Sequence, residues 1–175
     1  MDKMDGVETT VVFSLGSNLG NRLDFLKEAS RRLEACGKIQ KASSIVESKS
    51  WGYEDSSPYL NAVIKINTNW NPEELYELIS KIEHDLGRER DDSDGYSARK
   101  IDIDILYYGN RHISTENLEI PHPRLHIRNF VLLPLAEIAP SFIHPILKKT
   151  STDLLKESPD EGLVTYFSDL CDKKL

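Results

Sequence analysis

Hydrophobic and polar positions follow two different periods along this chain of 175 residues, and each period predicts one kind of element. Residues 9–15, 39–48, 59–67 and 99–108 have strand character, and the last of these segments alternates apolar with charged residues, which is typical of a strand with one buried face. Two intervening segments have apolar residues at helical spacing: Leu23, Leu26, Ala29 and Leu33 in one, and Leu75, Leu78, Ile79, Ile82 and Leu86 in the other. The pattern therefore predicts strands at these four places and a helix in each intervening segment.

The residues at the ends of the two helical segments support this interpretation. Asn21 stands where it can cap the first helix. The second begins with an N-cap asparagine, Asn71, followed by Pro72 at the first helical position and by Glu74 three residues after the cap. Gly87 follows its last apolar position. We therefore expect well-defined helix starts at both places.

The order of elements is β-α-β-β-α-β, which is typical of a ferredoxin-like α+β sandwich: an antiparallel sheet with two helices on one face. Residues 109–175 add a loop rich in proline and histidine, helical stretches near 130–139 and 152–156, and a last strand near 163–167. We expect a single domain over residues 9–167, with a flexible tail at 1–8 and a C-terminal tail at 168–175.

Composition narrows the classes of function. The net charge of -7 and the pI of about 5.3 argue against a nucleic-acid binder or a protein of anionic membrane surfaces. Cys36 and Cys171 lie far apart and read as free thiols. The sequence has no apolar run of the roughly 18 residues that a membrane span needs. We therefore expect a cytoplasmic protein whose anionic ligands are bound by a local cluster of cations.

The strand at 99–108 carries the first candidate chemistry. Asp102 and Asp104 fall on one face of it, about 7 Å apart, because successive side chains of a strand point to opposite faces. Carboxylates held side by side suit Mg²⁺, a hard cation that prefers oxygen ligands and keeps positions for phosphate. The alternative is an exposed strand face whose charges are balanced by lysines of a neighbour.

Two further groups have chemistry that complements the carboxylates. The cationic group, whose guanidinium forks suit phosphate, consists of Arg88, Arg90, Arg99, Arg124 and Arg128. His122 is a separate candidate, because the prolines on either side restrict its backbone and so hold its imidazole in place. The aromatic and amide group, which suits a flat heterocycle, consists of Trp51, Tyr59, Asn61, Tyr96 and Phe130. The alternatives are a solvated charged loop, a structural histidine and ordinary core packing.

The glycine-bearing turn at 16–20 has two interpretations. It leads into a helix and so can cradle an anion at the helix N-terminus. It lacks the Lys-Ser/Thr of a phosphate loop, and a tight strand-to-helix turn explains it equally well.

Taken together, the motifs resemble those of the 6-hydroxymethyl-7,8-dihydropterin pyrophosphokinase family of folate biosynthesis. The resemblance covers residues 9–145 and rests on four blocks in the expected order: FSLGSNLGNR at 13–22, YLNAV at 59–63, RKIDIDIL at 99–106, and PHPR at 121–124 followed by Arg128 and Phe130. It implies transfer of the β,γ-pyrophosphoryl group of ATP to the hydroxymethyl oxygen of the reduced pterin, with release of AMP.

The resemblance also implies a role for each matching residue. Asp102 and Asp104 would bind two Mg²⁺ ions. Apart from the resemblance, we expect the proton of the substrate hydroxyl to pass to one of these two carboxylates, and we choose Asp104. ATP would be bound by Glu83, Arg88, Arg99, Ile105, His122 and Arg128. The pterin would be bound by Ser48, Gly52, Tyr59, Asn61 and Phe130. Arg88, Arg90 and Arg99 would assist the transfer, with Arg90 on a loop at 88–96 that closes over ATP.

The chain departs from the family pattern in three places: at Tyr96-Ser97-Ala98, where many members have Trp-Gly-Pro, at Ser48-Lys49-Ser50, and at Pro123. Three other functions compete with the pyrophosphokinase. A ferredoxin-like domain can serve as a nucleotide-binding regulatory module without catalysis. A metal-dependent phosphohydrolase would use the same aspartates, but it would not need the aromatic and amide group. An inactive relative would have no need to retain both carboxylates and the main arginines.

Overall fold

The computed structural model describes residues 8–50, 57–87 and 99–171. The first part of the chain forms β1 (Thr9–Ser17), α1 (Arg22–Leu33), a 3₁₀ turn (Glu34–Cys36), β2 (Gly37–Ala42), β3 (Ser44–Ser48), β4 (Tyr59–Thr68), α2 (Pro72–Asp85) and β5 (Asp102–Tyr108). The second part adds β6 (Ile113–Ser114), β7 (Glu119–Ile120), a 3₁₀ turn (Leu125–Ile127), α3 (Asn129–Ile138), α4 (Ser151–Glu157) and β8 (Val164–Asp169).

The main sheet has six strands. Five of them lie in the order β5-β1-β4-β3-β8, and the sixth, β2, which precedes β3 in the chain, also pairs with β4. All of its pairings are antiparallel. If β2 and β3 are taken together as one strand, the order β5-β1-β4-β2/β3 is that of a ferredoxin-like sandwich. The predicted fold class is therefore confirmed.

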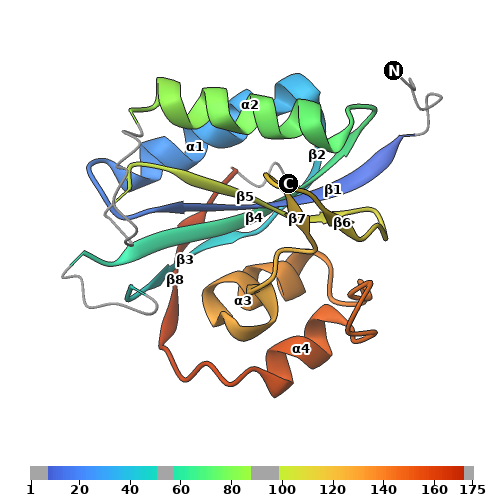
Figure 1. Ribbon diagram of the computed structural model, residues 1–175. Coiled ribbons are helices and arrows are strands. Elements are labelled where there is room, and N and C mark those ends of the chain that lie inside the picture. Colours follow the sequence, from blue (N-terminus) through green and yellow to red (C-terminus); the bar gives the residue numbers. More distant parts are fainter. Residues whose placement is uncertain (1–7, 51–56, 88–98, 172–175) are drawn as a thin grey trace.

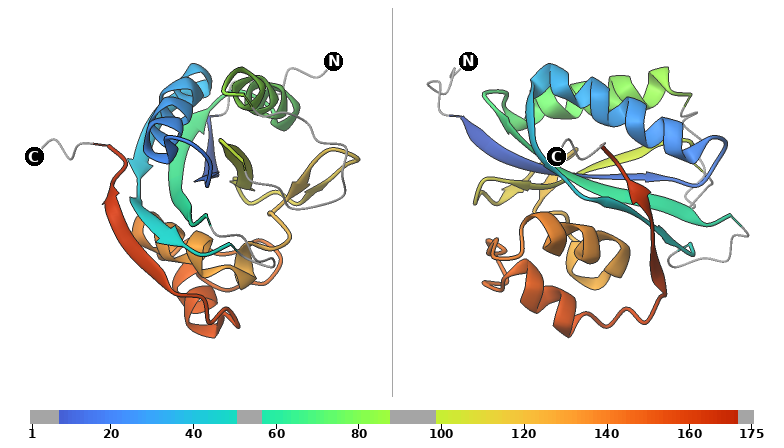
Figure 2. Two further views of the ribbon diagram at one scale, coloured as in Figure 1. Left: turned by 90° about the vertical axis from the view of Figure 1, so that its left-hand side faces the viewer. Right: turned by 180° about the vertical axis from the view of Figure 1, so that it is seen from behind.

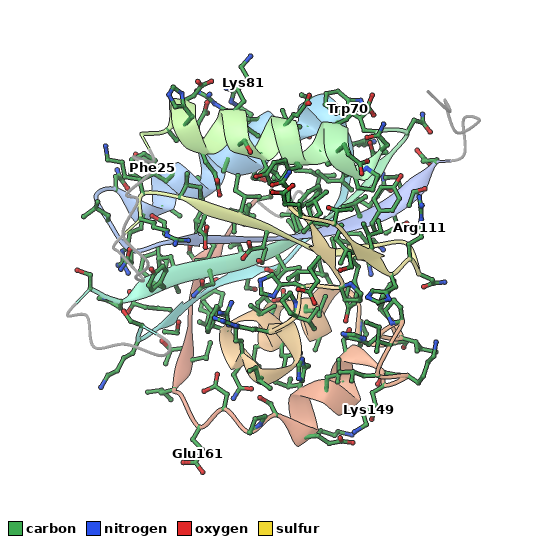
Figure 3. All side chains as sticks on the ribbon, in the orientation of Figure 1. Phe25, Trp70, Lys81, Arg111, Lys149 and Glu161 are labelled. Atoms are coloured by element: carbon green, nitrogen blue, oxygen red, sulfur yellow. The ribbon has the colours of Figure 1, made fainter. Side chains whose placement is uncertain are left out.

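Helices cover both faces of this sheet. Figure 1 shows α1 and α2 on one face and α3 and α4 on the other, and Figure 2 shows the same three layers from two further directions. The buried residues form two clusters, one that joins α1 and α2 to the sheet and one that joins α3 and α4 to its opposite face. The second helical layer is made by the chain after β5. Figure 3 shows side chains filling the space on both sides of the sheet.

The helix starts agree with the sequence prediction. Asn21 accepts a hydrogen bond from the backbone N–H of Asp24 at the start of α1. At α2, the Asn71 side chain accepts from the N–H of Glu74, and the Glu74 carboxylate accepts from the N–H of Asn71. Each cap satisfies backbone donors that the first turn of a helix leaves without partners.

The single strand predicted at 39–48 is wrong in one respect, because it is interrupted at Ser43. The buried Ser43 donates its backbone N–H to the Val63 carbonyl, and its hydroxyl accepts from the Val63 N–H, both at 2.9 Å. The next residue, Ser44, donates its N–H and its hydroxyl to the Glu137 carboxylate of α3. A side chain therefore replaces one backbone ladder bond at the break.

The chain after β5 differs from the prediction in two further details. The short hairpin of β6 and β7 was not predicted, because strands of two residues carry no measurable alternation. β8 extends to Asp169, and the following Leu170 is buried in the core, so this part of the predicted tail at 168–175 packs against the domain. No helix among the described residues is both long and apolar enough to cross a membrane.

Candidate active site

The paired aspartates lie side by side at one end of the edge strand β5. Asp102 pairs with Gly16 of β1 and Asp104 pairs with Ser14. Both side chains are partly exposed, with 29% and 38% of their surfaces accessible, whereas Ile103 between them is buried in the core under α2. The alternation predicted from the sequence therefore places both carboxylates on the open side of the strand.

Arg99 is fixed beside the first of these carboxylates. Its guanidinium donates to Asp102 Oδ1 at 3.0 Å. Its backbone is bound by Asn18, whose side-chain oxygen accepts from the Arg99 N–H at 2.7 Å and whose own N–H donates to the Arg99 carbonyl at 3.0 Å. Of the two interpretations of the turn at 16–20, the structure shows a strand-to-helix turn that anchors Arg99. Asn18 was not among the predicted site residues, although it lies in the glycine-bearing turn.

The backbone between the aspartates is bound from the other side by Glu83 of α2. The Glu83 carboxylate accepts a hydrogen bond of 2.8 Å from the N–H of Ile103, and only 8% of the Glu83 surface is exposed. A buried polar group of this kind costs stability unless it is paired. Glu83 therefore ties α2 to the edge strand that presents the two carboxylates.

His122 faces the second carboxylate from the loop after β7. Its Nε2 lies 3.7 Å from Asp104 Oδ2, and its Nδ1 accepts from the backbone N–H of Arg124 at 3.1 Å. The backbone N–H of His122 donates to the Leu106 carbonyl of β5. Burial, assisted by the charge of Arg128, lowers the pKa of His122 to about 4. The imidazole is therefore neutral at pH 7, and the bond at Nδ1 leaves its proton on Nε2, toward the site.

A large cavity of about 1020 Å³ opens on one side of the carboxylates. Its walls come from α2, from β5 and from the β6–β7 hairpin with the loop that follows it. The predicted residues Glu83, Arg99, Asp102, Asp104, Ile105 and His122 line it together with Tyr76, Ile79, Ser80, His84, Gly87, Ile103, Asn117, Leu118, Glu119, Ile120 and Pro123. The cavity combines polar groups beside β5 with apolar side chains farther along α2.

A smaller cavity of about 70 Å³ lies on the other side, between β1, β4 and the start of α3. Its lining consists of Ser14, Leu15, Gly16, Ser48, Lys49, Tyr59, Asn61, Ala62, Arg99, Asp102, Asp104, Arg128, Phe130 and Val131. Asn61 is 6% exposed, and its side-chain amide donates to the Ser48 hydroxyl at 3.2 Å. The Arg128 guanidinium stands over the Phe130 ring, 5.8 Å from its centroid. The cavity thus offers two aromatic rings, a buried amide and a cation.

Gly16 lies beside Asn61 in the wall of the smaller cavity. A methyl group at Gly16 would come within 3.1 Å of Asn61 Oδ1 and 3.8 Å of the Tyr59 ring. Only a residue without a side chain leaves the present place of this amide undisturbed. The glycine therefore shapes the smaller cavity.

The two cavities meet at three residues, since Arg99, Asp102 and Asp104 line both of them. A group bound in the large cavity and a group bound in the small one would thus approach each other across the same two carboxylates. This arrangement suits the transfer of a charged group between two ligands.

The structure brings most of the predicted site residues together at these cavities. Arg128, which we expected among the ATP-binding residues, lines the smaller cavity beside Phe130. Arg124 is exposed, and its backbone N–H orients His122. Five predicted residues, Trp51, Gly52, Arg88, Arg90 and Tyr96, lie outside the described part of the chain.

Comparisons with known proteins agree on one family. Residues 12–140 match the model of the 7,8-dihydro-6-hydroxymethylpterin-pyrophosphokinase (HPPK) family. A protein of Aquifex aeolicus (strain VF5) named 2-amino-4-hydroxy-6-hydroxymethyldihydropteridine pyrophosphokinase is 41% identical over 158 residues, which cover 90% of this chain and 95% of that protein. The protein of the same name from Bacillus subtilis (strain 168) is 46% identical over 127 residues, 71% of this chain and 75% of its own.

Longer proteins contain the same unit. The folic acid synthesis protein FOL1 of Dictyostelium discoideum is 40% identical over 152 residues, which cover 87% of this chain but 23% of that protein. The crystal structure of wild-type Plasmodium falciparum HPPK-DHPS superimposes with a TM-score of 0.70 at 17% identity, covering 88% of this chain and 45% of that one. At this identity the likeness shows the shared fold. On the sequence matches over most of its length, the chain belongs to the 7,8-dihydro-6-hydroxymethylpterin-pyrophosphokinase family.

Proposed function

We propose that this protein transfers pyrophosphate from ATP to the hydroxymethyl group of 6-hydroxymethyl-7,8-dihydropterin and releases AMP. The observation that carries the proposal is the shared lining of the two cavities by Arg99, Asp102 and Asp104. ATP would occupy the large cavity and the pterin the small one, so that the reacting groups meet at the carboxylates. The family and the relatives named above supply the identity of the two substrates.

The carboxylate pair fits magnesium. Asp102 and Asp104 offer hard oxygen ligands. Among the described residues there is no cluster of three or more acidic, histidine or cysteine side chains that could hold a metal by itself. Mg²⁺ is commonly bound by one or two carboxylates, with substrate phosphates and water completing the octahedron. Two such ions, when bound, would neutralise phosphate charge and polarise the reacting phosphoryl group.

The cations of the site would position the phosphates. Arg99 is fixed through its backbone by Asn18 and through its guanidinium by Asp102, so its donors point in a defined direction. His122 presents an Nε2–H and no charge of its own at pH 7, because burial holds its pKa at about 4. We assign His122 the role of a hydrogen-bond donor to a phosphate oxygen. Arg88 remains a predicted phosphate ligand and Arg90 a residue predicted to assist the transfer, and both lie outside the described residues.

The smaller cavity would orient the pterin. Tyr59 and Phe130 provide aromatic surface for a flat ring, and aromatic pairs of this kind favour stacking. Asn61 carries both a donor and an acceptor, the pair needed to read the edge of a heterocycle, and Ser48 orients it. Arg128, above the Phe130 ring, would face the end of the pterin site that is nearest the ATP phosphates. Gly52, beyond the described residues, remains a predicted part of this pocket.

The chemical step balances with these groups. The hydroxymethyl oxygen of the pterin attacks the β-phosphorus of ATP, the bond from that phosphorus to the bridging oxygen of the α-phosphate breaks, and AMP leaves with that oxygen. The proton of the hydroxyl passes to the Asp104 carboxylate, which lies at the junction of the cavities. The remaining contribution of the chain is to align the two substrates, which is the main requirement of phosphoryl transfer.

The competing functions explain the site less well. A nucleotide-binding regulatory module has no need for a second cavity that shares its acidic wall with the first. A phosphohydrolase of simple esters would not need the aromatic and amide lining of the smaller cavity. The relatives from Aquifex aeolicus and Bacillus subtilis also carry the name of the pyrophosphokinase.

Product analysis tests the proposal. The protein is incubated with ATP, Mg²⁺ and 6-hydroxymethyl-7,8-dihydropterin, and nucleotides and pterins are separated by liquid chromatography with mass detection. We expect AMP and pyrophosphorylated pterin in equal amounts, and neither without the pterin. Formation of ADP or free phosphate would instead indicate a kinase or a hydrolase.

A further inference from the structure

The N-terminal turn of α3 carries two residues of the smaller cavity, Arg128 as its N-cap and Phe130 in its first turn. This turn lacks the usual means of fixing a helix end. The Arg128 side chain makes no capping hydrogen bond. Pro134 inside the helix has no N–H, so the Phe130 carbonyl cannot receive the bond that residue would otherwise donate. Within the helix, the turn is held by the two backbone bonds that the Arg128 carbonyl accepts from Val131 and Leu132, so contacts from outside the helix add to the fixing of Phe130.

Those contacts come from Asp160, in the segment that joins α4 to β8. The Asp160 carboxylate accepts from the backbone N–H of Asn129 at 2.7 Å. The Asn129 side chain donates in return to the Asp160 carbonyl at 2.6 Å. The other carboxylate oxygen of Asp160 accepts from the N–H of Gly162 at 2.8 Å. Two segments 31 residues apart in sequence are thus joined by reciprocal bonds.

The arrangement is electrostatically favourable. A carboxylate beside the first N–H groups of a helix interacts well with the positive end of the helix dipole and satisfies a donor that the helix leaves unpaired. The contact with Gly162 sets the direction of the carboxylate, since each oxygen has its own donor. Asp160 lies beyond residues 12–140, the part of the chain that matches the family model.

We propose that Asp160 is a positioning residue of the smaller cavity: it caps α3 from outside the helix and thereby sets the places of Arg128 and Phe130. The effect of Asp160 on pterin binding rests on the proposed function, whereas its effect on the position of α3 does not.

The test uses Asp160→Ala, with Glu161→Ala as the matched control. Glu161 is the exposed neighbour that carries the same charge, and Figure 3 shows it pointing away from the body of the protein. Hydrogen exchange of residues 125–135 reports on α3 directly. Binding of 6-hydroxymethyl-7,8-dihydropterin, with Mg²⁺ and a non-hydrolysable ATP analogue present, reports on the cavity.

We expect faster exchange at the start of α3 in Asp160→Ala and a dissociation constant for the pterin that is about three- to tenfold higher, the effect of losing one helix cap. The affinity for the ATP analogue should change much less, and Glu161→Ala should match the wild type. A folded Asp160→Ala protein with unchanged exchange and pterin binding would overturn the inference, as would equal losses for both ligands.

Two further variants keep the test decisive if Asp160→Ala does not fold. Asp160→Asn retains an oxygen for only one of the two N–H groups, and Asn129→Ala removes only the returned bond. Both should shift pterin binding in the same direction by a smaller factor, and wild-type behaviour in both would refute the assignment. If the wild type bound no pterin, the proposed function would fail, whereas the exchange measurement would still decide whether Asp160 positions α3.

Discussion

The Glu83 carboxylate accepts a 2.8 Å hydrogen bond from the backbone N–H of Ile103, the residue between the two aspartates of β5. This contact connects α2 with the edge strand at the point where Asp102 and Asp104 must be held at a fixed separation. We expect Glu83→Ala to lower the free energy of unfolding by about 1–3 kcal/mol, because a buried N–H loses its acceptor. Glu83→Gln, which keeps an oxygen at that place, should lose less. Urea denaturation measures both variants, and equal stability of Glu83→Ala and the wild type would show that the bond contributes nothing.

Asn61 should act on one substrate only. Its buried amide lies in the smaller cavity beside Ser48, and it does not line the larger one. We expect Asn61→Ala to raise the dissociation constant of the pterin about tenfold or more, as for loss of buried hydrogen bonds to a ligand, with ATP affinity little changed. Separate titrations with the two substrates measure this. Equal losses for both would mean that Asn61 is structural.

Gly16 should influence the pterin without contacting it through a side chain. In Gly16→Ala the new methyl group would stand 3.1 Å from Asn61 Oδ1, so the amide must move by a few tenths of an ångström. We expect weaker pterin binding, by about three- to tenfold, with a melting temperature close to that of the wild type. Ligand titration and thermal unfolding of the same preparation check both parts. Ala62→Gly in the same cavity wall serves as a control for small changes of volume, and an unchanged pterin affinity in Gly16→Ala would contradict the proposed orientation of Asn61.

The free energy of unfolding of the protein should fall in mild acid because of the buried histidine His144. His144 is buried and accepts two backbone N–H bonds at Nδ1, from Ile146 and Leu147. Burial, with a smaller effect of His126, lowers the pKa of His144 from 6.5 to about 4. The unfolded chain therefore binds the proton more readily, and protonation favours unfolding as the pH falls from about 6.5 toward 4. The slope from one such histidine is at most about 1.4 kcal/mol per pH unit.

The variant His144→Asn isolates this contribution. It keeps an oxygen acceptor near the place of Nδ1 but does not titrate, so its free energy of unfolding should depend less on pH between 4 and 6.5 than that of the wild type. His112→Asn, at an exposed position, is the control and should keep the wild-type slope. Parallel curves for all three proteins would show that His144 is not responsible.

The regular parts of the fold could be predicted because their signals are local. The cap of α2, formed by Asn71, Pro72 and Glu74, lies within four positions of the sequence, and the alternation around Asp102 identified the strand and its open face. The ferredoxin-like order followed from the succession of elements alone. The break at Ser43 could not be predicted in this way, because it depends on Val63 of a neighbouring strand.

The same distinction holds at the site. Residues whose chemistry is visible in the sequence, such as the paired aspartates and His122 between two prolines, could be proposed in advance. The positioning contacts could not, because Asn18 acts on Arg99 across 81 residues of sequence, and Glu83, which was predicted only as an ATP ligand, acts on Ile103 across 20. The division of the site into two cavities also depends on packing, which places Arg128 beside Phe130 in the lining of the smaller cavity.

The most direct test of the central claim is the pterin-dependent formation of AMP, measured across a range of Mg²⁺ concentrations. The proteins compared are the wild type, Asp102→Asn, Asp104→Asn and the surface control Glu161→Gln. We expect the wild type and the control to form AMP only when Mg²⁺ and the pterin are both present, and to stop when the metal is chelated. Each aspartate variant should remain folded and lose turnover by about 10²–10³-fold or more, as when a group that stabilises transition-state charge is removed. Near-normal turnover in either variant, or AMP formation without the pterin, would contradict the account.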